Sequence, residues 1–238
     1  MSKLASDTAM VLAAGMGKRM RPLTATQPKP MVRVAGKPLI DHTLDRLDEA
    51  GIAKAVVNVH YLAENLEAHL AARKSPAIVV SDERAQLLET GGGLIKAQAD
   101  LPDPFFCLNS DNIWLDGPQD CFADLSAIWD PDRMDALLLV VPHKRAYNFR
   151  GLGDFNLDET GLVSRRTEAR LAPFIFTGIQ LIAKRLLRDA PEGPFSTNLL
   201  WSRAIEEGRL FGLPFTGQWF EVGTPEAIKP TEAALLDV

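Results

Sequence analysis

The sequence contains few cysteines and few histidines, which narrows the kinds of site it can build. Its 238 residues include two cysteines, Cys107 and Cys121, and four histidines. Neither cysteine belongs to a CxxC pair or a Cys/His cluster, so a disulfide framework and a zinc site of ordinary ligand spacing are excluded. We therefore expect a protein of a reduced compartment, the cytoplasm.

Long apolar runs and an excess of positive charge are also missing. No segment reaches the roughly 18 apolar residues of a membrane helix, so we expect no membrane partner. The short apolar stretch near the N-terminus leads directly into a glycine motif, which indicates a first strand and not a signal peptide. The formal net charge is -5, whereas nucleic-acid-binding domains are usually basic, so we expect no nucleic-acid partner.

What is present is an alternation of short apolar runs with segments whose apolar residues recur at helical spacing. The predicted strands are 9–14, 55–59, 77–80, 104–108, 136–141 and 174–182. The predicted helices are 39–50, 62–73, 94–99, 122–129, 184–188, 197–207 and a last one that ends near residue 236. This order predicts an α/β fold with a parallel sheet between two helix layers. Residues 148–161 instead predict a hairpin in a smaller antiparallel lobe.

The stretch Thr8–Pro30 is the most informative part of the sequence. Gly15 and Gly17 end the first predicted strand, and Met20 follows them. Four cations stand close by: Lys18, Arg19, Arg21 and Lys29. Glycines let backbone N–H groups approach phosphate oxygens and the cations neutralise charge, so this pattern favours a polyanionic ligand. It is neither a P-loop, because one residue separates its glycines, nor a dinucleotide fingerprint, because Met20 occupies the third glycine position.

Residues 12–24 read L-A-A-G-x-G-x-R-x-R-P-L-T, and P-K-P follows at 28–30. This string resembles the signature of the sugar-1-phosphate nucleotidyltransferases, which join a sugar phosphate to an NTP and release pyrophosphate. The resemblance implies a Rossmann-like, doubly wound mixed sheet of the GT-A-like kind with a small antiparallel sugar-binding lobe. It also implies a single domain, with a nucleotide-binding half at about 8–145 and a sugar-binding half at about 146–238. The sequence has no hexapeptide repeat, which is the pattern of the trimerising β-helix found in larger relatives. We therefore expect a monomer or weak homodimer.

The same resemblance implies roles for individual residues. Arg19 would hold the NTP phosphates and Lys29 the sugar phosphate, both as catalytic residues. Asp111 follows a predicted strand and would bind Mg²⁺. Its partner would be Glu221 in GQWFEVGT, where the family has an aspartate. The implied nucleotide contacts are Ala13, Gly15, Gly17, Lys18, Glu83, Thr90 and Gly91.

Two glycine-containing segments carry the predicted base and sugar contacts. The segment Glu89–Gly93 is expected to be a loop before a helix, with a backbone that approaches a flat base closely. Glu83 is the candidate acceptor for the N3 proton of uracil. The implied sugar contacts are Asn109, Gly153, Thr177, Gly178 and Arg166.

At residues 163–168 the sequence departs from many hexose-1-phosphate members. They carry Glu-Lys-Pro near this position, whereas this sequence reads VSRRTE. Arg165 and Arg166 are either part of a solvated face, or one of them pairs with an acidic group on the sugar.

Finer features are most similar to the uridylyltransferases that act on UTP and N-acetylmuramate 1-phosphate in bacterial cell-wall recycling. These features are the short length, the TGGG segment, the VGT ending and the missing Glu-Lys-Pro. The alternatives are enzymes that use mannose 1-phosphate with GTP, or glucose 1-phosphate with UTP or dTTP, and a phosphocholine cytidylyltransferase. An alternative of another class is a nucleotide sensor without catalysis. A sensor is expected to lack Arg19, Lys29 or the metal carboxylates, and all of these are present.

Overall fold

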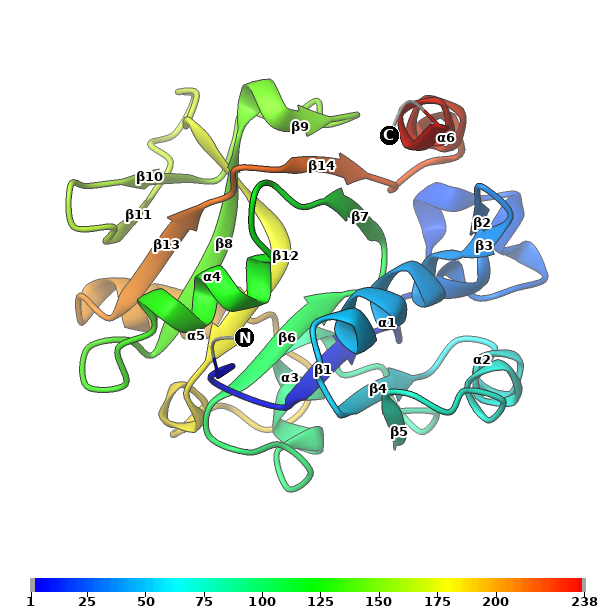
Figure 1. The fold of residues 1–238 in the computed structure, drawn as a ribbon. Helices are drawn as coiled ribbons and strands as arrows, with labels where there is room; N and C mark the ends of the chain where they lie inside the picture. The colour runs from blue at the N-terminus through cyan, green and yellow to red at the C-terminus, as the bar shows by residue number, and fades with distance from the viewer. Residues whose placement is uncertain (1–2, 237–238) are drawn as a thin grey trace.

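The computed structural model describes residues 3–236, and a nine-stranded mixed sheet runs through this part of the chain (Figure 1). Its path is β11-β10-β12-β6-β1-β4-β5, and β8 pairs with both β12 and β13. The strands are β1 (Thr8–Leu12), β4 (Lys54–Val59), β5 (Ala77–Asp82), β6 (Phe105–Asn109), β8 (Ala136–Pro142), β10 (Phe155–Leu157), β11 (Val163–Arg165), β12 (Phe174–Ile182) and β13 (Leu210–Pro214).

The N-terminal part of this sheet is parallel. β5, β4, β1 and β6 run in one direction, and β12 runs antiparallel to β6. The register pairs Leu12 with Asn109 at the carboxyl ends of β1 and β6. The doubly wound mixed sheet implied by the family resemblance is therefore confirmed, and these two strand ends mark where a ligand is expected.

Helices cover both faces of the sheet. α1 (Leu39–Glu49), α2 (Ala63–Leu70) and α4 (Cys121–Ile128) contribute to one apolar core, while α3 (Glu89–Ala97) and α5 (Asn198–Glu206) contribute to the other. In β1, Ala9 and Val11 belong to the first core and Met10 to the second. A strand buried on both faces needs the continuous apolar run that the sequence shows there.

Two smaller sheets lie beside α1 (Figure 1). β7 (Asn112–Leu115), β14 (Gln218–Glu221) and β9 (Ala146–Tyr147) form a three-stranded sheet, and β2 (Arg33–Val34) pairs with β3 (Lys37–Pro38). β2, β7 and β14 share a third apolar cluster with α6 (Ile228–Leu236), and this cluster contains Met20 and Phe220. Within residues 3–236, no helix combines the length and apolar character needed to span a membrane.

Two predicted features differ in the structure. The hairpin forms as β10 and β11, and it pairs with β12, so it extends the central sheet. Glu89–Gly93 is not a loop but the first part of α3. A Cβ on Gly91 would lie 2.3 Å from the Phe195 ring, and one on Gly92 would lie 2.5 Å from the Gly193 carbonyl oxygen. These glycines therefore let α3 pack closely against the protein itself.

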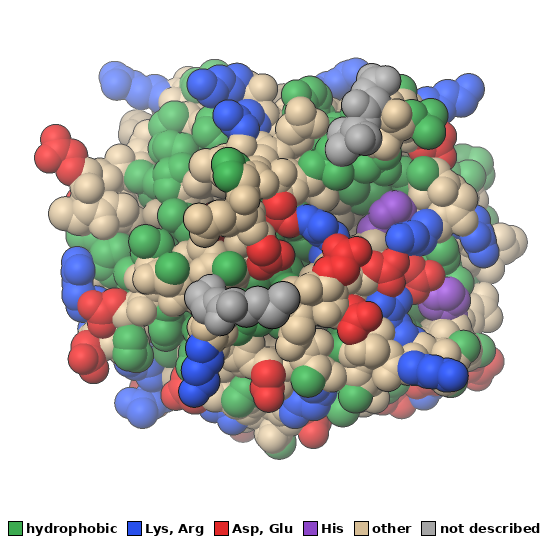
Figure 2. Space-filling view, in the orientation of Figure 1, with side chains coloured by type: hydrophobic (Ala, Val, Ile, Leu, Met, Phe, Trp, Pro, Cys, Tyr) green, Lys and Arg blue, Asp and Glu red, His purple; other side chains and the backbone are tan. Residues whose placement is uncertain are grey.

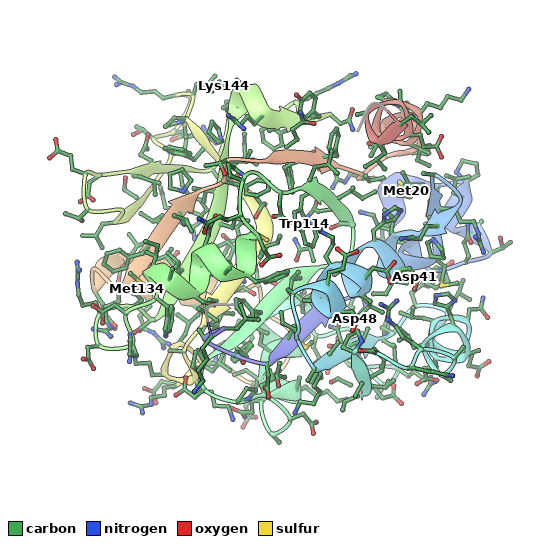
Figure 3. All side chains as sticks on the ribbon, viewed as in Figure 1. Met20, Asp41, Asp48, Trp114, Met134 and Lys144 are labelled. Carbon is green, nitrogen blue, oxygen red and sulfur yellow. The ribbon has the colours of Figure 1, made fainter. Side chains whose placement is uncertain are left out.

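The acidic residues of α1 form a charged outer face next to arginine and histidine side chains (Figures 2 and 3). Asp41 accepts a hydrogen bond from His69 Nε2 at 2.9 Å, and Asp45 accepts from Lys37 and Arg73 at 2.7 Å each. Partial burial opposes ionisation of Asp45, but these hydrogen bonds lower its pKa. The charges of this face are balanced locally, which is typical of a solvated helix.

Candidate active site

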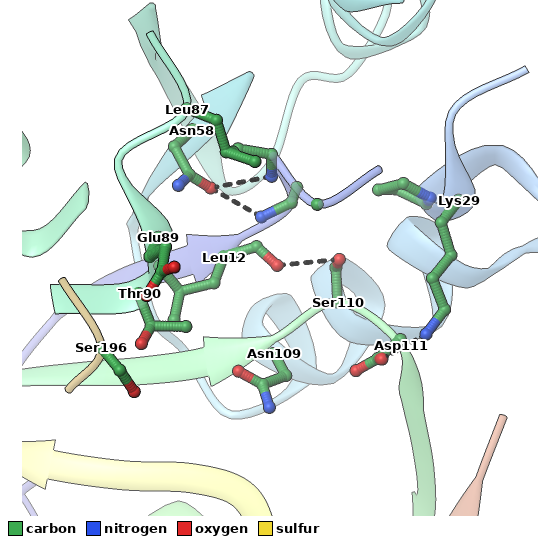
Figure 4. Close-up of a pocket in the computed structure, with 14 residues that line it drawn as sticks. Leu12, Lys29, Asn58, Leu87, Glu89, Thr90, Asn109, Ser110, Asp111 and Ser196 are labelled. Atoms are coloured by element: carbon green, nitrogen blue, oxygen red, sulfur yellow. Dashed lines mark hydrogen bonds and ion pairs between the residues drawn. The ribbon is translucent and has the colours of Figure 1, made fainter. Parts of the chain in front are cut away.

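A cavity of about 410 Å³ opens at the carboxyl ends of β1 and β6 (Figure 4). The strand ends supply Leu12 and Asn109, and Ser110 Oγ donates to the Leu12 carbonyl oxygen at 2.9 Å. Lys29 and Asp111 lie on one side of the cavity, with Thr90 and Ser196 on the other. Its remaining lining residues are Ala13, Ala14, Gly15, Pro30, Asn58, Leu87 and Glu89. Open α/β sheets bind ligands at this edge, so the position matches the expectation.

Asn58 is a lining residue that the sequence reasoning missed. Its Oδ1 accepts hydrogen bonds from the backbone N–H groups of Ala13 at 2.6 Å and Ala14 at 3.2 Å. Its Nδ2 donates to Glu83 Oε1 at 2.7 Å. The sequence does contain a signal for this residue, because Asn58 is the one polar side chain in the apolar run AVVNV. Asn58 therefore fixes the start of the glycine loop.

Glu83 and Gly91, both predicted as nucleotide contacts, lie outside the cavity. Glu83 is fully buried behind Asn58 and also accepts the Leu88 N–H at 3.1 Å, so its oxygens are used within the protein. Gly91 packs on Phe195 and donates its N–H to the Phe195 carbonyl at 2.8 Å. Neither residue lines the cavity, whereas Thr90 does.

A smaller cavity of about 310 Å³ adjoins the first, because Gly15, Lys29 and Asp111 line both. Its other lining residues are Gly17, Lys18, Arg19 and Gly223. Gly17 has φ +59°, and a Cβ there would lie 2.8 Å from Lys29 Cβ. The sequence needs glycine at this position, because both the backbone conformation and the space exclude a side chain.

Two ion pairs cross this region. Lys29 Nζ donates to Asp111 Oδ2, and Arg19 Nη1 donates to Glu221 Oε1 at 3.2 Å. Arg19 is exposed, whereas the other three side chains are partly buried. All four charged groups that the sequence predicted at this site are thus brought into one region.

Strand pairing explains how the segments that carry Asp111 and Glu221 come to lie side by side. β14 runs antiparallel to β7, which places Glu221 opposite Asn112, and the Val222 N–H donates to the Asp111 carbonyl at 3.3 Å. No group of three or more potential metal-binding His, Cys, Asp or Glu residues occurs within residues 3–236. Mg²⁺ uses one or two carboxylates together with substrate phosphates, so this pair of hard oxygen donors fits it.

A second cavity, of about 440 Å³, continues from the first and shares Leu12, Thr90, Asn109 and Ser196 with it. Three residues predicted to contact the sugar line it: Asn109, Gly153 and Arg166. Arg165, the other arginine that the sequence offered as a partner for an acidic sugar group, lines it too. The structure adds Asp154, Phe155, Phe176, Gln180, Thr197, Asn198 and Trp201.

Thr177 and Gly178 do not reach either cavity, in contrast to their predicted role. Thr177 is fully buried, and its hydroxyl donates to the Leu139 carbonyl at 2.8 Å. Gly178 has φ +84°, and a Cβ there would lie 3.0 Å from Asn109 Nδ2 and closer still to Asn112. Gly178 therefore leaves room for the side chains of Asn109 and Asn112, and the Thr177 carbonyl accepts a hydrogen bond from Asn112 Nδ2 at 2.9 Å.

Comparison with known proteins identifies the family and related sequences. A family model described as "Nucleotidyl transferase" matches residues 8–237. An N-acetylmuramate alpha-1-phosphate uridylyltransferase of Caulobacter vibrioides is 45% identical over 238 residues, covering 98% of each chain. A protein of the same name from Neisseria meningitidis is 32% identical and covers 94% of this chain and 96% of the relative. A mannose-1-phosphate guanylyltransferase catalytic subunit beta of Drosophila pseudoobscura is 29% identical, and the alignment covers 92% of this chain and 59% of that longer protein.

Solved structures show the same fold at low sequence identity. UDP-glucose pyrophosphorylase in complex with UDP-glucose superposes with a TM-score of 0.78 at 14% identity, over 98% of this chain and 99% of that one. The inositol-1-phosphate CTP transferase of T. maritima also has a TM-score of 0.78, at 17% identity, over 98% and 96% of the two chains. The family resemblance inferred from residues 12–30 is confirmed.

Proposed function

We propose that this chain, which belongs to the nucleotidyl transferase family, transfers the uridylyl group of UTP to N-acetylmuramate α-1-phosphate and releases pyrophosphate. The observation that carries the proposal is the 45% identity over 98% of both chains to an enzyme named for this reaction. Members of the family bind a nucleoside triphosphate and a sugar 1-phosphate. The reaction belongs to the reuse of cell-wall sugars.

The three adjoining cavities are proposed to bind different parts of the two substrates. The first is proposed to hold the nucleoside, with Thr90 and the backbone after Leu12 facing the base. The cavity beside Gly15 and Lys18 is proposed to hold the triphosphate. The second cavity takes the sugar, and Asn109 stands at the boundary where the two substrates meet.

The proposed reaction is an in-line displacement at phosphorus. A phosphate oxygen of the sugar phosphate forms a bond to the α-phosphorus, and the bond from that phosphorus to the bridging oxygen of the β-phosphate breaks. Positioning and charge neutralisation supply most of the rate in such a reaction. Arg19 binds the triphosphate. Lys29 binds the sugar phosphate and offsets the repulsion between this phosphate and the triphosphate.

Enzymes of this family generally use a divalent metal ion, and we assign Mg²⁺ to Asp111 and Glu221. When bound, such an ion neutralises phosphate charge and fixes phosphate geometry. Arg19 and Lys29 neutralise the same two carboxylates in the structure, so these cations occupy the positions from which they can turn to phosphate oxygens.

The test is a matrix of pyrophosphate-release assays. UTP, CTP, GTP and dTTP are each combined with the 1-phosphates of N-acetylmuramate, N-acetylglucosamine, mannose and glucose. We expect UTP with N-acetylmuramate 1-phosphate to have the highest kcat/KM. A preference for GTP with mannose 1-phosphate would make the chain a guanylyltransferase, and no release from any pair would make it a sensor.

We further propose that the enzyme acts in the cytoplasm, as a monomer or weak homodimer. Cys107 and Cys121 are both free and buried, which is consistent with a reduced compartment. Sedimentation velocity over a range of concentrations tests the oligomeric state, and a stable trimer contradicts it.

A further inference from the structure

The two arginines of VSRRTE both line the second cavity, and the proposed reaction gives them no role. Within residues 3–236, neither Arg165 nor Arg166 forms an ion pair with a carboxylate. Two neighbouring positive charges therefore border the sugar cavity without an ion-pairing carboxylate, and the one carboxylate among the described residues that line this cavity, Asp154, attracts Arg165 through space only. An anionic group on the ligand is the natural partner for such a charge.

The two guanidinium groups are held differently. Arg165 donates from Nη1 to Asn198 Oδ1 at 2.8 Å, and from Nη2 to the Asn198 carbonyl at 3.0 Å and to Ser202 Oγ at 3.2 Å. It also lies over the Phe155 ring, 5.5 Å from its centre. Arg166 donates only to backbone carbonyls of its own loop, at Thr167 and Arg170. Arg165 is thus fixed against the start of α5. Its guanidinium has five N–H donors and these three hydrogen bonds use only part of them, so donors remain for a ligand.

Thr197 supplies a second, independent observation at the same place. It directly precedes α5 and lines the second cavity, and only 3% of its surface is exposed. Its Oγ1 has no hydrogen-bond partner among the described residues. A buried hydroxyl without a partner is costly, so a ligand group is expected to complete it. The N–H groups of Thr197, Asn198 and Leu199 are bonded within the protein, so the N-terminus of α5 contributes the positive end of its dipole and not free donors.

We propose that Arg165, the Thr197 hydroxyl and the N-terminus of α5 form a carboxylate subsite in the second cavity. This inference rests on the proposed function and deepens it, because it makes the enzyme selective for sugar 1-phosphates whose ring or ring substituent carries a carboxylate. The lactyl group of N-acetylmuramate is such a substituent. The phosphate of the same substrate is held elsewhere, at Lys29, so the two anionic groups of the sugar are bound at separate places.

The test compares two acceptors that differ only in the lactyl group: N-acetylmuramate 1-phosphate and N-acetylglucosamine 1-phosphate, each with UTP. Arg165→Gln removes a charged hydrogen bond and is expected to lower kcat/KM for the first acceptor by about 10- to 100-fold, mainly through KM. For the second acceptor the change is expected to stay within about 3-fold, because no carboxylate is present to lose its partner.

Thr197→Val removes the hydroxyl at nearly constant volume. Because that hydroxyl has no partner within the protein, the midpoint of thermal unfolding is expected not to fall. The kcat/KM for N-acetylmuramate 1-phosphate is expected to fall by about 5- to 10-fold. A lower unfolding midpoint with unchanged selectivity would show a purely structural residue and would overturn the assignment of Thr197.

Arg133→Gln is the matched control. The Arg133 guanidinium lies over the Phe211 ring, 5.2 Å from its centre, as Arg165 lies over Phe155, but Arg133 lines neither cavity. It is expected to leave the ratio between the two acceptors unchanged. An equal loss on both acceptors in Arg165→Gln, or a loss of selectivity that follows Arg166→Gln instead, overturns the subsite.

Failure of the proposed function gives a different result. If the wild-type enzyme does not use N-acetylmuramate 1-phosphate, the function is wrong, and the subsite is judged on glucuronate 1-phosphate against glucose 1-phosphate. A preference for glucuronate 1-phosphate that Arg165→Gln abolishes supports the carboxylate subsite. Equal use of both acceptors, or a preference for glucose 1-phosphate, overturns it.

Discussion

Arg19 and Glu221 are separated by 202 positions in the chain, yet Arg19 Nη1 donates to Glu221 Oε1 at 3.2 Å. Lys29 and Asp111 form a second ion pair in the same region. Each cation proposed to bind phosphate is therefore in contact with a carboxylate proposed to bind metal. These four charges pair within the protein before any ligand enters. In the proposed function, phosphate oxygens would take over the two cations, and the two carboxylates would hold a divalent ion that offsets phosphate charge.

Removing either member of the Lys29–Asp111 pair is expected to disable the reaction. Lys29→Ala and Asp111→Ala should each lower kcat by at least about 100-fold, as for removal of one positioned charge. Lys37→Ala is the matched control, because Lys37 forms a similar ion pair with Asp45 on the outer face of α1. Turnover close to wild type in a folded Lys29 or Asp111 variant would contradict the assignment.

Glu221 is expected to set the affinity for the metal. Glu221→Gln should raise the Mg²⁺ concentration for half-maximal rate by about 10-fold or more, since a carboxylate ligand is lost. Binding of Mn²⁺ to the UTP complex, followed by electron paramagnetic resonance, should weaken by a similar factor. Glu49→Gln, on the outer face of α1, should change neither quantity. An unchanged metal requirement in Glu221→Gln would remove Glu221 from the metal site.

Asn58 is expected to couple the glycine loop to the buried Glu83. Asn58→Ala leaves Glu83 Oε1 and two backbone N–H groups without their Asn58 partner, while Glu83 Oε2 keeps the Leu88 N–H. The free energy of unfolding should fall by about 1–3 kcal/mol, measured by urea denaturation. The KM for UTP should rise as well, because the loop after Leu12 loses its anchor. Unchanged stability and KM would show that water replaces this side chain at no cost.

Gly91 is expected to tolerate no side chain. The Cβ of Gly91→Ala would lie 2.3 Å from the Phe195 ring, so α3 or the ring must move, at a cost of about 1–3 kcal/mol in unfolding free energy. Gly15→Ala serves as the stability control, because no atom lies within 4 Å of the added Cβ. Equal unfolding midpoints for the two variants would contradict the close packing described for α3.

Neither cysteine is expected to react in the folded protein. Burial raises the pKa of Cys107 to about 12, despite an opposing hydrogen bond with Gln180, and burial also raises the pKa of Cys121. Because a raised pKa keeps the thiol protonated until the pH approaches that value, almost no thiolate exists at about pH 8. A thiol reagent should label both residues only after denaturation, and rapid labelling of the native enzyme would show that the core opens.

Patterns within short stretches of sequence determined much of this protein. The apolar run before Gly15, the helical spacing of α1 and the string L-A-A-G-x-G-x-R-x-R-P-L-T are all local, and each led to a correct element or to the correct family. They could be interpreted because strand and helix periodicity, and the demand of a turn for glycine, act over a few residues.

Only the tertiary structure decided which polar groups face the cavities. Glu83 points into the protein because Asn58 on the neighbouring strand donates a hydrogen bond to its carboxylate. Gly91 of α3 faces the ring of Phe195, which is about a hundred positions away in the chain. Thr197 joined the site because the start of α5 packs beside α3, where Thr90 Oγ1 accepts its N–H at 2.9 Å. Such contacts depend on how distant segments pack together, and no local periodicity records them.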